Sequence, residues 1–295
     1  MKVLIFGSNG QDGTYLSAYL KTLAIEVIGI SRSGGDIVGS VSDFRLVSEV
    51  VKNHKPNFIF HFAAISTTRH DSLFDNHAAI STGTLNILEA VRVHSPESKV
   101  FLSGSALQFK NNGLPIDENT DFDPSSAYSV ARIHSIYAGR YYRKAFNMKI
   151  YAGYFFNHDS PLRSVQHINQ KIVSVVHRIA KGSDEKLELG NIEVKKEFNY
   201  AGDVVESIWK LVSQDSIFEA VIGNGTAHSI KDFTDYCFRK INKDYRDYIV
   251  IKEDFIPEYD VLVSNPALIR SIGCEAKVDF YQLVDLMMES YDSNL

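Results

Sequence analysis

The sequence has few of the features that mark secreted, membrane-spanning or metal-binding proteins. It contains 2 Cys in 295 residues, and we expect Cys237 and Cys274 to be free thiols because disulfides persist mainly in oxidising compartments. No stretch approaches the ~18 apolar residues that a membrane-spanning helix needs, and the apolar start of the chain is too short for a secretory signal. No CxxC or HExxH spacing occurs, so no metal site is predicted. We therefore expect a cytoplasmic protein that works without a membrane.

An excess of basic residues is also missing. Lys and Arg number 31 against 36 Asp and Glu, which gives a net charge of −5, and no long Lys/Arg run is present. This balance argues against a partner that is a nucleic acid polymer, because polymer binding depends on neutralising many phosphates. Hydrophobic residues make up 44% of the chain, enough for a large core. A small anionic ligand remains compatible with a locally positive site.

Short apolar runs alternate with segments of helical periodicity through the first half of the chain. The runs at 3–6, 26–30, 58–62, 99–102 and 150–156 read as buried parallel strands, and helices are expected near 11–23, 47–55, 77–94 and 126–146. This alternation predicts an α/β fold, a Rossmann-type doubly wound parallel sheet. Beyond it, a helix near 168–181 and a strand near 186–190 indicate a smaller C-terminal substrate lobe. We assign residues 1–160, with returning segments near 195–225, to a dinucleotide-binding domain and the remainder of 161–295 to the lobe.

A glycine-rich loop follows the first strand. Gly7, Gly10 and Gly13 form a GxxGxxG spacing that opens a helix of apolar periodicity. Glycine suits a tight turn and the close approach of a diphosphate, and the helix N-terminus offers free N–H groups to the phosphates. The loop stands in the strand–turn–helix context that the dinucleotide-binding motif requires. At the end of the second strand, Arg32 stands where an NAD-selective site would carry Asp or Glu, which favours NADP, with NAD as the alternative.

A tyrosine and a basic residue share one face of a helix further along. Tyr128 and Arg132 are four residues apart, so the phenol and the guanidinium can face the same cleft. Hydride transfer to or from an alcohol carbon needs a proton donor or acceptor at the oxygen, and a tyrosine serves when a fixed cation lowers its pKa. The pair is weak evidence by itself and gains weight from the dinucleotide loop.

Several motifs together make the chain resemble a known family. It resembles the extended short-chain dehydrogenase/reductases that act on nucleotide sugars, most closely the GDP-mannose 4,6-dehydratases and next the GDP-4-keto-6-deoxymannose reductases. The similarity runs from residue 1 to about 240. It is carried by the glycine loop at 7–13 and the segments 29–33, 62–66, 83–90, 156–163 and 189–191, with Phe156-Asn157-His158-Asp159-Ser160-Pro161 the most specific.

The resemblance implies roles for the matching positions. Residues expected to line the cofactor are Gly7, Asn9, Gly10, Gln11, Asp12, Gly13, Arg32, Ala63, Ala64, Ser66, His158 and Arg163. Residues expected to face the diphosphate or base of a nucleotide-sugar substrate are Asn157, Lys171 and, in the Lys195-Lys196 stretch, Lys196. For Lys195-Lys196 a solvated charge pair is an equal alternative. The resemblance also implies a homodimer through the helices at 77–94 and 126–146. Tyr137, Tyr141 and Tyr142 on the second of these belong to the interface or to the core, and the core is expected.

The sequence departs from the dehydratase pattern inside the site. Gly104 stands at the threonine position and Ala106 at the position of the glutamate that exchanges protons. Arg132 replaces the family lysine, Ile256-Pro257 stands for an Arg-Pro pair, and Ser40 stands for an acidic residue that contacts adenine. Losing one acid/base commonly costs ~10²–10⁴ in rate, which disfavours elimination. The catalytic set is then expected to be Tyr128, Arg132 and a strand-end hydroxyl, Ser105 or Ser103.

Three functions remain open from the sequence. The first is an NADP-dependent oxidoreductase, most simply a 4-keto reductase of a GDP-linked deoxysugar. The second is a GDP-mannose 4,6-dehydratase-like lyase with a rebuilt acid/base, for which Asp117 or Glu118 qualify only if their loop folds inward. The third is a non-catalytic protein that binds NADP or a nucleotide sugar.

Overall fold

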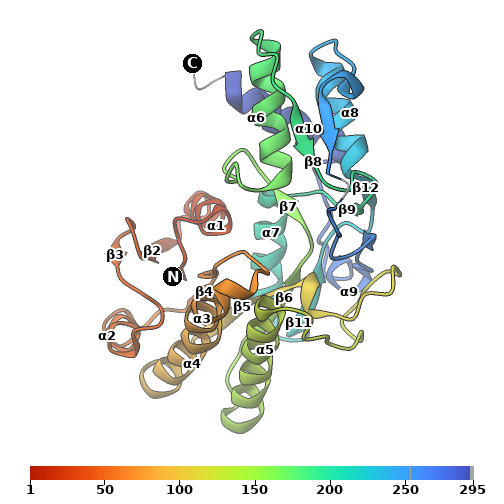
Figure 1. The fold of residues 1–295 in the computed structure, drawn as a ribbon. Coiled ribbons are helices and arrows are strands. Elements are labelled where there is room, and N and C mark those ends of the chain that lie inside the picture. Colours follow the sequence, from red (N-terminus) through yellow and green to blue (C-terminus); the bar gives the residue numbers. More distant parts are fainter. Residues whose placement is uncertain (253, 293–295) are drawn as a thin grey trace.

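A seven-stranded parallel sheet forms the centre of the molecule (Figure 1). The computed structural model describes residues 1–252 and 254–292. The strand order is β11-β6-β5-β4-β1-β2-β3, so the chain reverses direction across the sheet between β1 and β4. The strands are β1 (Lys2–Phe6), β2 (Glu26–Ser31), β3 (Ile37–Val38), β4 (Phe58–His61), β5 (Lys99–Ser105), β6 (Ile150–Phe155) and β11 (Glu219–Ile222).

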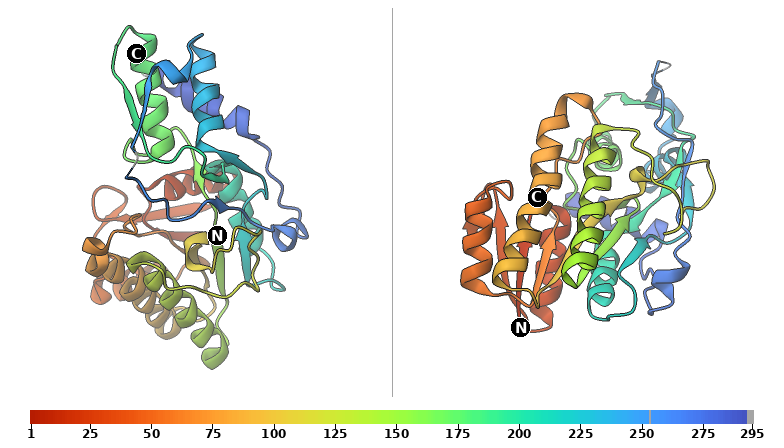
Figure 2. Two further views of the ribbon diagram at one scale, coloured as in Figure 1. Left: turned by 45° about the vertical axis from the view of Figure 1, so that its right-hand side comes forward. Right: turned by 90° about the horizontal axis from the view of Figure 1, so that it is seen from below.

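Alternate residues of the strands supply two cores, one on each face of the sheet. Val3 and Ile5 of β1 pack with α1 (Gln11–Thr22) and α7 (Ala201–Val212), whereas Leu4 and Phe6 pack with α2 (Phe44–His54) and α4 (Gly83–His94). The long α5 (Ala127–Phe146) lies beside α4 (Figures 1 and 2). This arrangement confirms the predicted doubly wound α/β fold.

The C-terminal third builds a separate hydrophobic core. Helices α6 (Ile168–Ala180), α8 (Ile230–Lys240) and α10 (Phe280–Asp292) pack together at the top of Figure 1, around stacked Phe198 and Phe233. Paired short strands flank this cluster, and α7 and β11 return the chain to the main sheet. The remaining elements are β7 (His158–Asp159), β8 (Leu187–Leu189), β9 (Lys195–Glu197), β10 (Asn199–Tyr200), β12 (Ala227–Ser229), β13 (Ile249–Ile251), β14 (Val261–Leu262), α3 (Leu73–Asn76), α9 (Ala267–Arg270) and the single turns His70–Ser72, Ala106–Gln108 and Tyr245–Asp247.

Two elements differ from the sequence prediction near the site. The helix expected over 77–94 begins as a π-helix at His77–Thr82 and becomes regular only at Gly83. A Cβ at Gly83 would lie 2.8 Å from Val41, so this turn packs closely against the sheet edge. The strand expected at 99–102 continues to Ser105, because residues 103–105 pair in register with residues 153–155 of β6.

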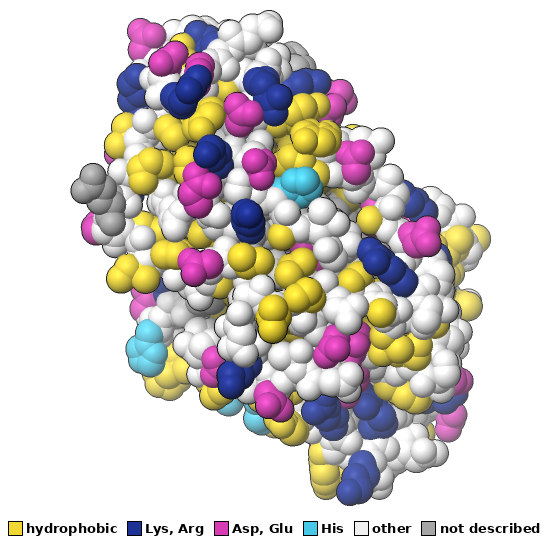
Figure 3. All heavy atoms as spheres, turned by 90° about the vertical axis from the view of Figure 1, so that its right-hand side faces the viewer, with side chains coloured by type: hydrophobic (Ala, Val, Ile, Leu, Met, Phe, Trp, Pro, Cys, Tyr) yellow, Lys and Arg dark blue, Asp and Glu magenta, His cyan; other side chains and the backbone are white. Residues whose placement is uncertain are grey.

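The surface carries no broad field of one charge on the face seen in Figure 3, where Lys and Arg alternate with Asp and Glu. Tyr137 and Tyr141 are 56% and 59% exposed, so the expectation that they belong to the core is wrong; they lie on the outward side of α5. Cys237 and Cys274 are both buried and free. Within residues 1–252 and 254–292, no helix has the length and apolarity to cross a membrane, and no three His, Cys, Asp or Glu converge as metal ligands would.

Candidate active site

The glycine loop forms a tight turn between β1 and α1. Gly7 has a φ of +90°, and a Cβ there would lie 2.6 Å from the backbone nitrogen of Ala63. A Cβ on Gly13 would collide with the Gly7 carbonyl, so this glycine lets the helix pack onto the loop. Gly10 precedes the first turn of α1 and provides no side-chain cap, which leaves N–H groups of that turn open. An anionic group fits such a helix start.

A groove continues from this loop along the carboxyl ends of β1 and β2. It adjoins a second hollow, here called the cavity, and Phe62 and Ala64 line both. Arg32 is exposed on its rim, and Asn9 reaches across to the Ser33 carbonyl. The groove lining includes the predicted cofactor residues Gly7, Asn9, Gly10, Arg32, Ala63 and Ala64.

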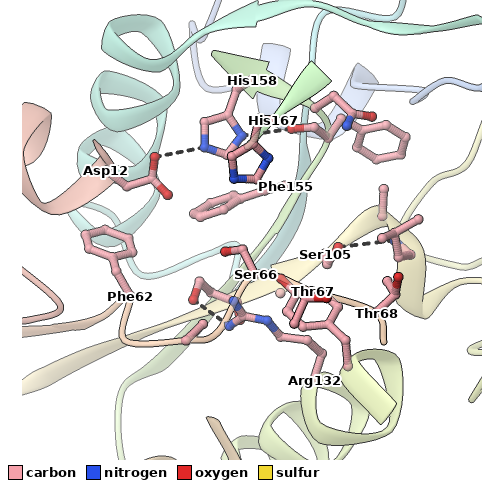
Figure 4. A pocket seen from close by; sticks show the side chains of 18 of the residues that line it. Asp12, Phe62, Ser66, Thr67, Thr68, Ser105, Arg132, Phe155, His158 and His167 are labelled. Carbon is pink, nitrogen blue, oxygen red and sulfur yellow. Dashed lines mark hydrogen bonds and ion pairs between the residues drawn. The ribbon is translucent and has the colours of Figure 1, made fainter. Parts of the chain in front are cut away.

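The cavity lies over the ends of β5 and β6, and Arg163 and His167 of the loop that follows β7 line one side of it (Figure 4). It brings together residues from six separated parts of the chain. The predicted site residues that line it are Asp12, Ala64, Ser66, Ser105, Tyr128, Arg132, Asn157, His158 and Arg163.

A buried ion pair joins the glycine loop to β7 at the edge of this cavity. Nε2 of His158 lies 2.8 Å from Oδ1 of Asp12, and its Nδ1 donates to the Phe156 carbonyl at 2.9 Å. Burial alone would raise the pKa of Asp12, but the charge and hydrogen bond of His158 hold it at about 2. Burial opposes the charge on His158, yet the Asp12 carboxylate raises its pKa overall.

Tyr128 and Arg132 both face the cavity, but the guanidinium is committed to the protein. Nη1 of Arg132 donates to the Ser103 carbonyl and, at 2.7 Å, to the Ser103 hydroxyl. Its Cζ lies 5.0 Å from the centre of the Tyr128 ring, a cation–π contact with the ring face. Arg132 therefore supports the tyrosine and the end of β5.

Hydrogen bonds at the end of β5 distinguish Ser103 from Ser105, the two catalytic candidates that the sequence left open. Ser103 donates to the His61 carbonyl at 2.8 Å and accepts from Arg132, so its hydroxyl is occupied. Ser105 accepts from the Leu107 N–H at 3.2 Å and keeps its own proton for a ligand. Ser105, Gly104 and Ala106 all line the cavity.

Some predicted residues lie elsewhere. Gln11 accepts a hydrogen bond from the Ser160 hydroxyl at 2.8 Å, and Gly13 lets α1 pack onto the loop. Among the described residues that line the groove and the cavity, neither of the two is found. Lys171 donates to the Glu188 carbonyl at 2.7 Å and lines a separate surface hollow. Lys196 is buried against Phe198, behind the cavity wall.

The two carboxylates considered as a rebuilt acid/base also point away. Glu118 accepts from the Val221 N–H at 2.7 Å, and Asp117 closes a turn with Asn119 and Thr120. Conversely, Thr67, Thr68 and His167 line the cavity although sequence reasoning did not select them. Thr67 and Thr68 lie in a loop and His167 at a helix start, where polar residues are common, so no local signal pointed to a site.

Comparison with known proteins identifies the family of the chain. The family model for GDP-mannose 4,6 dehydratase matches residues 4–287. The chain belongs to this family. It is thereby one of the nucleotide-sugar enzymes of the extended short-chain dehydrogenase/reductase group.

A relative and two solved structures illustrate the similarity. GDP-mannose 4,6 dehydratase 1 of Arabidopsis thaliana is 29% identical over 318 residues, covering 97% of this chain and 88% of the relative. RMD from Pseudomonas aeruginosa complexed with NADPH superposes with a TM-score of 0.88 at 17% identity, over 100% of this chain and 99% of that one. UDP-glucose 4-epimerase of Thermus thermophilus, a complex with NAD, gives a TM-score of 0.86 at 18% identity, over 100% of both chains. At these identities the two structures support the fold alone.

Proposed function

We propose that this chain is an NADP-dependent oxidoreductase of a nucleotide-linked sugar, most simply a reductase of a GDP-linked 4-keto sugar. The observation that carries this proposal is the set of residues that line the cavity over the ends of β5 and β6. Tyr128 and Ser105 face it, and Ala106 stands where the resembled dehydratases have glutamate. Asp12 is the one carboxylate among the described lining residues, and it is paired with His158. Hydride transfer needs one proton at the reacting oxygen, whereas elimination needs a further acid/base.

The groove suits a dinucleotide with a 2′-phosphate. The loop from Gly7 to Gly10 and the uncapped start of α1 would hold the diphosphate, and Arg32 on the rim would bind the 2′-phosphate. The neighbours RMD and UDP-glucose 4-epimerase carry NADPH and NAD respectively, so Arg32 decides our choice of NADP. The bound nicotinamide would supply the hydride.

The protein's own part in the reaction is to hold the keto oxygen and protonate it. Ser105 donates a hydrogen bond to that oxygen, and Tyr128 gives it the phenolic proton. Arg132 holds the tyrosine ring and the end of β5 in place. Asn157 in the cavity lining would contact the nucleotide part of the substrate, and Arg163 would contact the cofactor. A cytoplasmic location and a homodimer belong to the same proposal.

The test is consumption of NADPH with GDP-4-keto-6-deoxymannose, followed at the nicotinamide absorption band. We expect Tyr128→Phe to lower the rate ~10²–10⁴-fold. Tyr137→Phe, on the exposed side of the same helix, should keep the full rate. If the wild-type protein consumes no NADPH with a panel of GDP-, UDP- and dTDP-linked keto sugars, the proposal is wrong.

A 4,6-dehydratase is the second candidate, and the family match over residues 4–287 favours it. That enzyme would convert GDP-mannose to a 4-keto-6-deoxy sugar without net NADPH consumption, which product analysis detects. Tight NADPH binding without turnover of any substrate would instead indicate the non-catalytic protein.

A further inference from the structure

The side chain of Gln108 holds Ser105, the residue whose hydroxyl is proposed to bind the keto oxygen. Gln108 ends the single turn that follows β5, and it is fully buried. Its Oε1 accepts a hydrogen bond from the Ser105 N–H at 2.9 Å, while the Ser105 hydroxyl accepts from the Leu107 N–H at 3.2 Å. The two bonds form a capping box, so the backbone and the hydroxyl of Ser105 are fixed together.

Gln108 also ties this turn to the segment that leads into Tyr128. Its backbone carbonyl accepts a hydrogen bond from the Asp123 N–H at 2.8 Å. The next residue, Phe109, forms an antiparallel bridge with Phe122, and their ring centroids are 5.1 Å apart. Tyr128 follows soon after Asp123, in the first turn of α5. One residue therefore joins the supports of both groups that the proposed reduction places at the keto oxygen.

The amide of Gln108 is suited to holding Ser105 and poorly suited to stabilising a core. Its Nε2 is buried and, among the described residues, has no hydrogen-bond partner. An unpaired buried donor costs free energy, so the side chain contributes through Oε1 alone. Glycine at position 104 leaves room for this oxygen, because a Cβ on Gly104 would lie only 3.0 Å from it.

We propose that Gln108 is a positioning residue that sets the Ser105 hydroxyl against the Tyr128 phenol, so that both meet one oxygen of the substrate. The inference rests on the proposed function, because it needs Ser105 and Tyr128 at the keto oxygen. Gln108 is not among the described residues that line the cavity, so it acts through Ser105 and through the segment before α5. A small displacement of groups that contact a reacting atom lowers the rate far more than it lowers binding. Loss of Oε1 should therefore appear in kcat.

Gln108→Met tests this role, because methionine has nearly the length of glutamine but no acceptor oxygen. We expect kcat for the NADPH-dependent reduction of GDP-4-keto-6-deoxymannose to fall ~10–10²-fold, with KM for the sugar within ~3-fold of wild type. The dissociation constant of NADPH, measured by fluorescence titration, should stay within ~2-fold, since neither Gln108 nor Ser105 is among the described residues of the groove. Gln108→Glu should recover most of the rate at about pH 6, where burial favours a neutral carboxyl group whose carbonyl oxygen accepts the Ser105 N–H.

Gln214→Met is the matched control. Gln214 is a half-buried glutamine whose amide donates to the Leu211 and Ile217 carbonyls, both at 2.6 Å, and accepts from the Ser216 N–H at 2.6 Å. It is absent from the described linings of the groove and the cavity. This variant should lower the urea midpoint of unfolding at least as much as Gln108→Met and leave kcat unchanged.

The outcomes separate the role of Gln108 from the proposed function. Reduction by the wild-type protein together with an unchanged kcat in Gln108→Met overturns the positioning role and leaves the reductase standing. Gln108→Glu that is as slow as Gln108→Met also overturns it, because the loss would not follow the acceptor oxygen. An equal fall of kcat in Gln214→Met overturns it as well, because the loss would then reflect general destabilisation. If the wild-type protein reduces no keto sugar, the proposed function is wrong and the role of Gln108 is wrong with it.

Discussion

The imidazole of His158 and the carboxylate of Asp12 meet at 2.8 Å although they lie 146 residues apart in the chain. Asp12 belongs to the first turn of α1, and His158 begins β7, so this contact ties the glycine loop to the strand that leads into the C-terminal lobe. Both side chains are largely buried, at 19% and 9% exposure. The pair forms part of the lining of the cavity.

The Asp12–His158 pair should make stability depend on pH. The lowered pKa of Asp12 contributes stability above its unfolded value of ~3.9, which is lost as pH falls toward about 2. The raised pKa of His158 contributes stability below its unfolded value of ~6.5, which is lost as pH rises through the folded value. We therefore expect the pair to stabilise the fold most between pH ~4 and ~6.5, by about 2 kcal/mol.

Urea unfolding of Asp12→Asn, His158→Asn and the double variant from pH 4 to 9 measures this coupling. The double-mutant cycle should give a coupling energy that is largest near pH 5–6 and shrinks at alkaline pH. A coupling that is flat across this range would show that the two groups do not form a charged pair.

Gly7 should tolerate alanine worse than another glycine with a similar backbone. Gly7 has a φ of +90° and Gly113 a φ of +77°, but a Cβ on Gly7 would meet Ala63 at 2.6 Å, whereas one on Gly113 meets nothing within 4 Å. Gly113→Ala should cost only the backbone strain, about 1 kcal/mol. Gly7→Ala should cost at least ~2 kcal/mol and weaken NADPH binding at least tenfold. Chemical denaturation and NADPH fluorescence titration check both; equal losses would mean that the close approach to Ala63 is unimportant.

Arg132 should resist replacement by the lysine that the resembled family carries. Its Nη1 donates to both the carbonyl and the hydroxyl of Ser103 while the planar guanidinium lies over the Tyr128 ring. A lysine ammonium cannot reproduce this planar arrangement. We expect Arg132→Lys to lower the free energy of unfolding by about 1–3 kcal/mol and to lower, not raise, the NADPH-dependent rate. Arg45→Lys, at 88% side-chain exposure, is the control and should lie within ~0.5 kcal/mol of wild type. A faster Arg132→Lys enzyme would contradict the supporting role.

The sequence was informative where local pattern decides structure. The tight turn formed by Gly7, Gly10 and Gly13 could be predicted because the strand, the turn and the helix are contiguous in the chain. The orientation of the Arg132 side chain was not predictable, since it depends on hydrogen bonds to Ser103, which lies 29 residues earlier in β5. Glu118 likewise turns to the Val221 N–H, 103 residues away, and leaves the cavity. His167 was missed because a polar residue before a helix looks like an ordinary helix start.

Gly104 stands where the resembled dehydratases carry threonine, and the side chains packed beneath Gly104 leave little room for a larger residue. A Cβ on Gly104 would lie 2.6 Å from Cδ1 of Tyr154 and 3.0 Å from Oε1 of Gln108. Tyr154 cannot easily move, because its hydroxyl bonds Glu219 at 2.5 Å and its ring packs on Phe109 at 4.8 Å between centroids. Restoring threonine at this position therefore overpacks the end of β5.

Ala106 lines the cavity as Gly104 does but already carries a Cβ, so the two family residues should differ in how they can be restored. We expect Gly104→Thr to lower the free energy of unfolding by about 1–3 kcal/mol, measured by urea denaturation, and Ala106→Glu to lower it less.

The two changes together should not yield dehydration of GDP-mannose, because a threonine forced against Tyr154 displaces the strand end that carries Ser105. Adding Tyr154→Leu, which frees space beside Gly104, should recover part of the lost stability in the Gly104→Thr background while destabilising the wild-type chain. If Gly104→Thr is as stable as wild type, the Tyr154 ring can move aside despite its contacts with Glu219 and Phe109. The presence of glycine in place of the family threonine would then be independent of the packing below it.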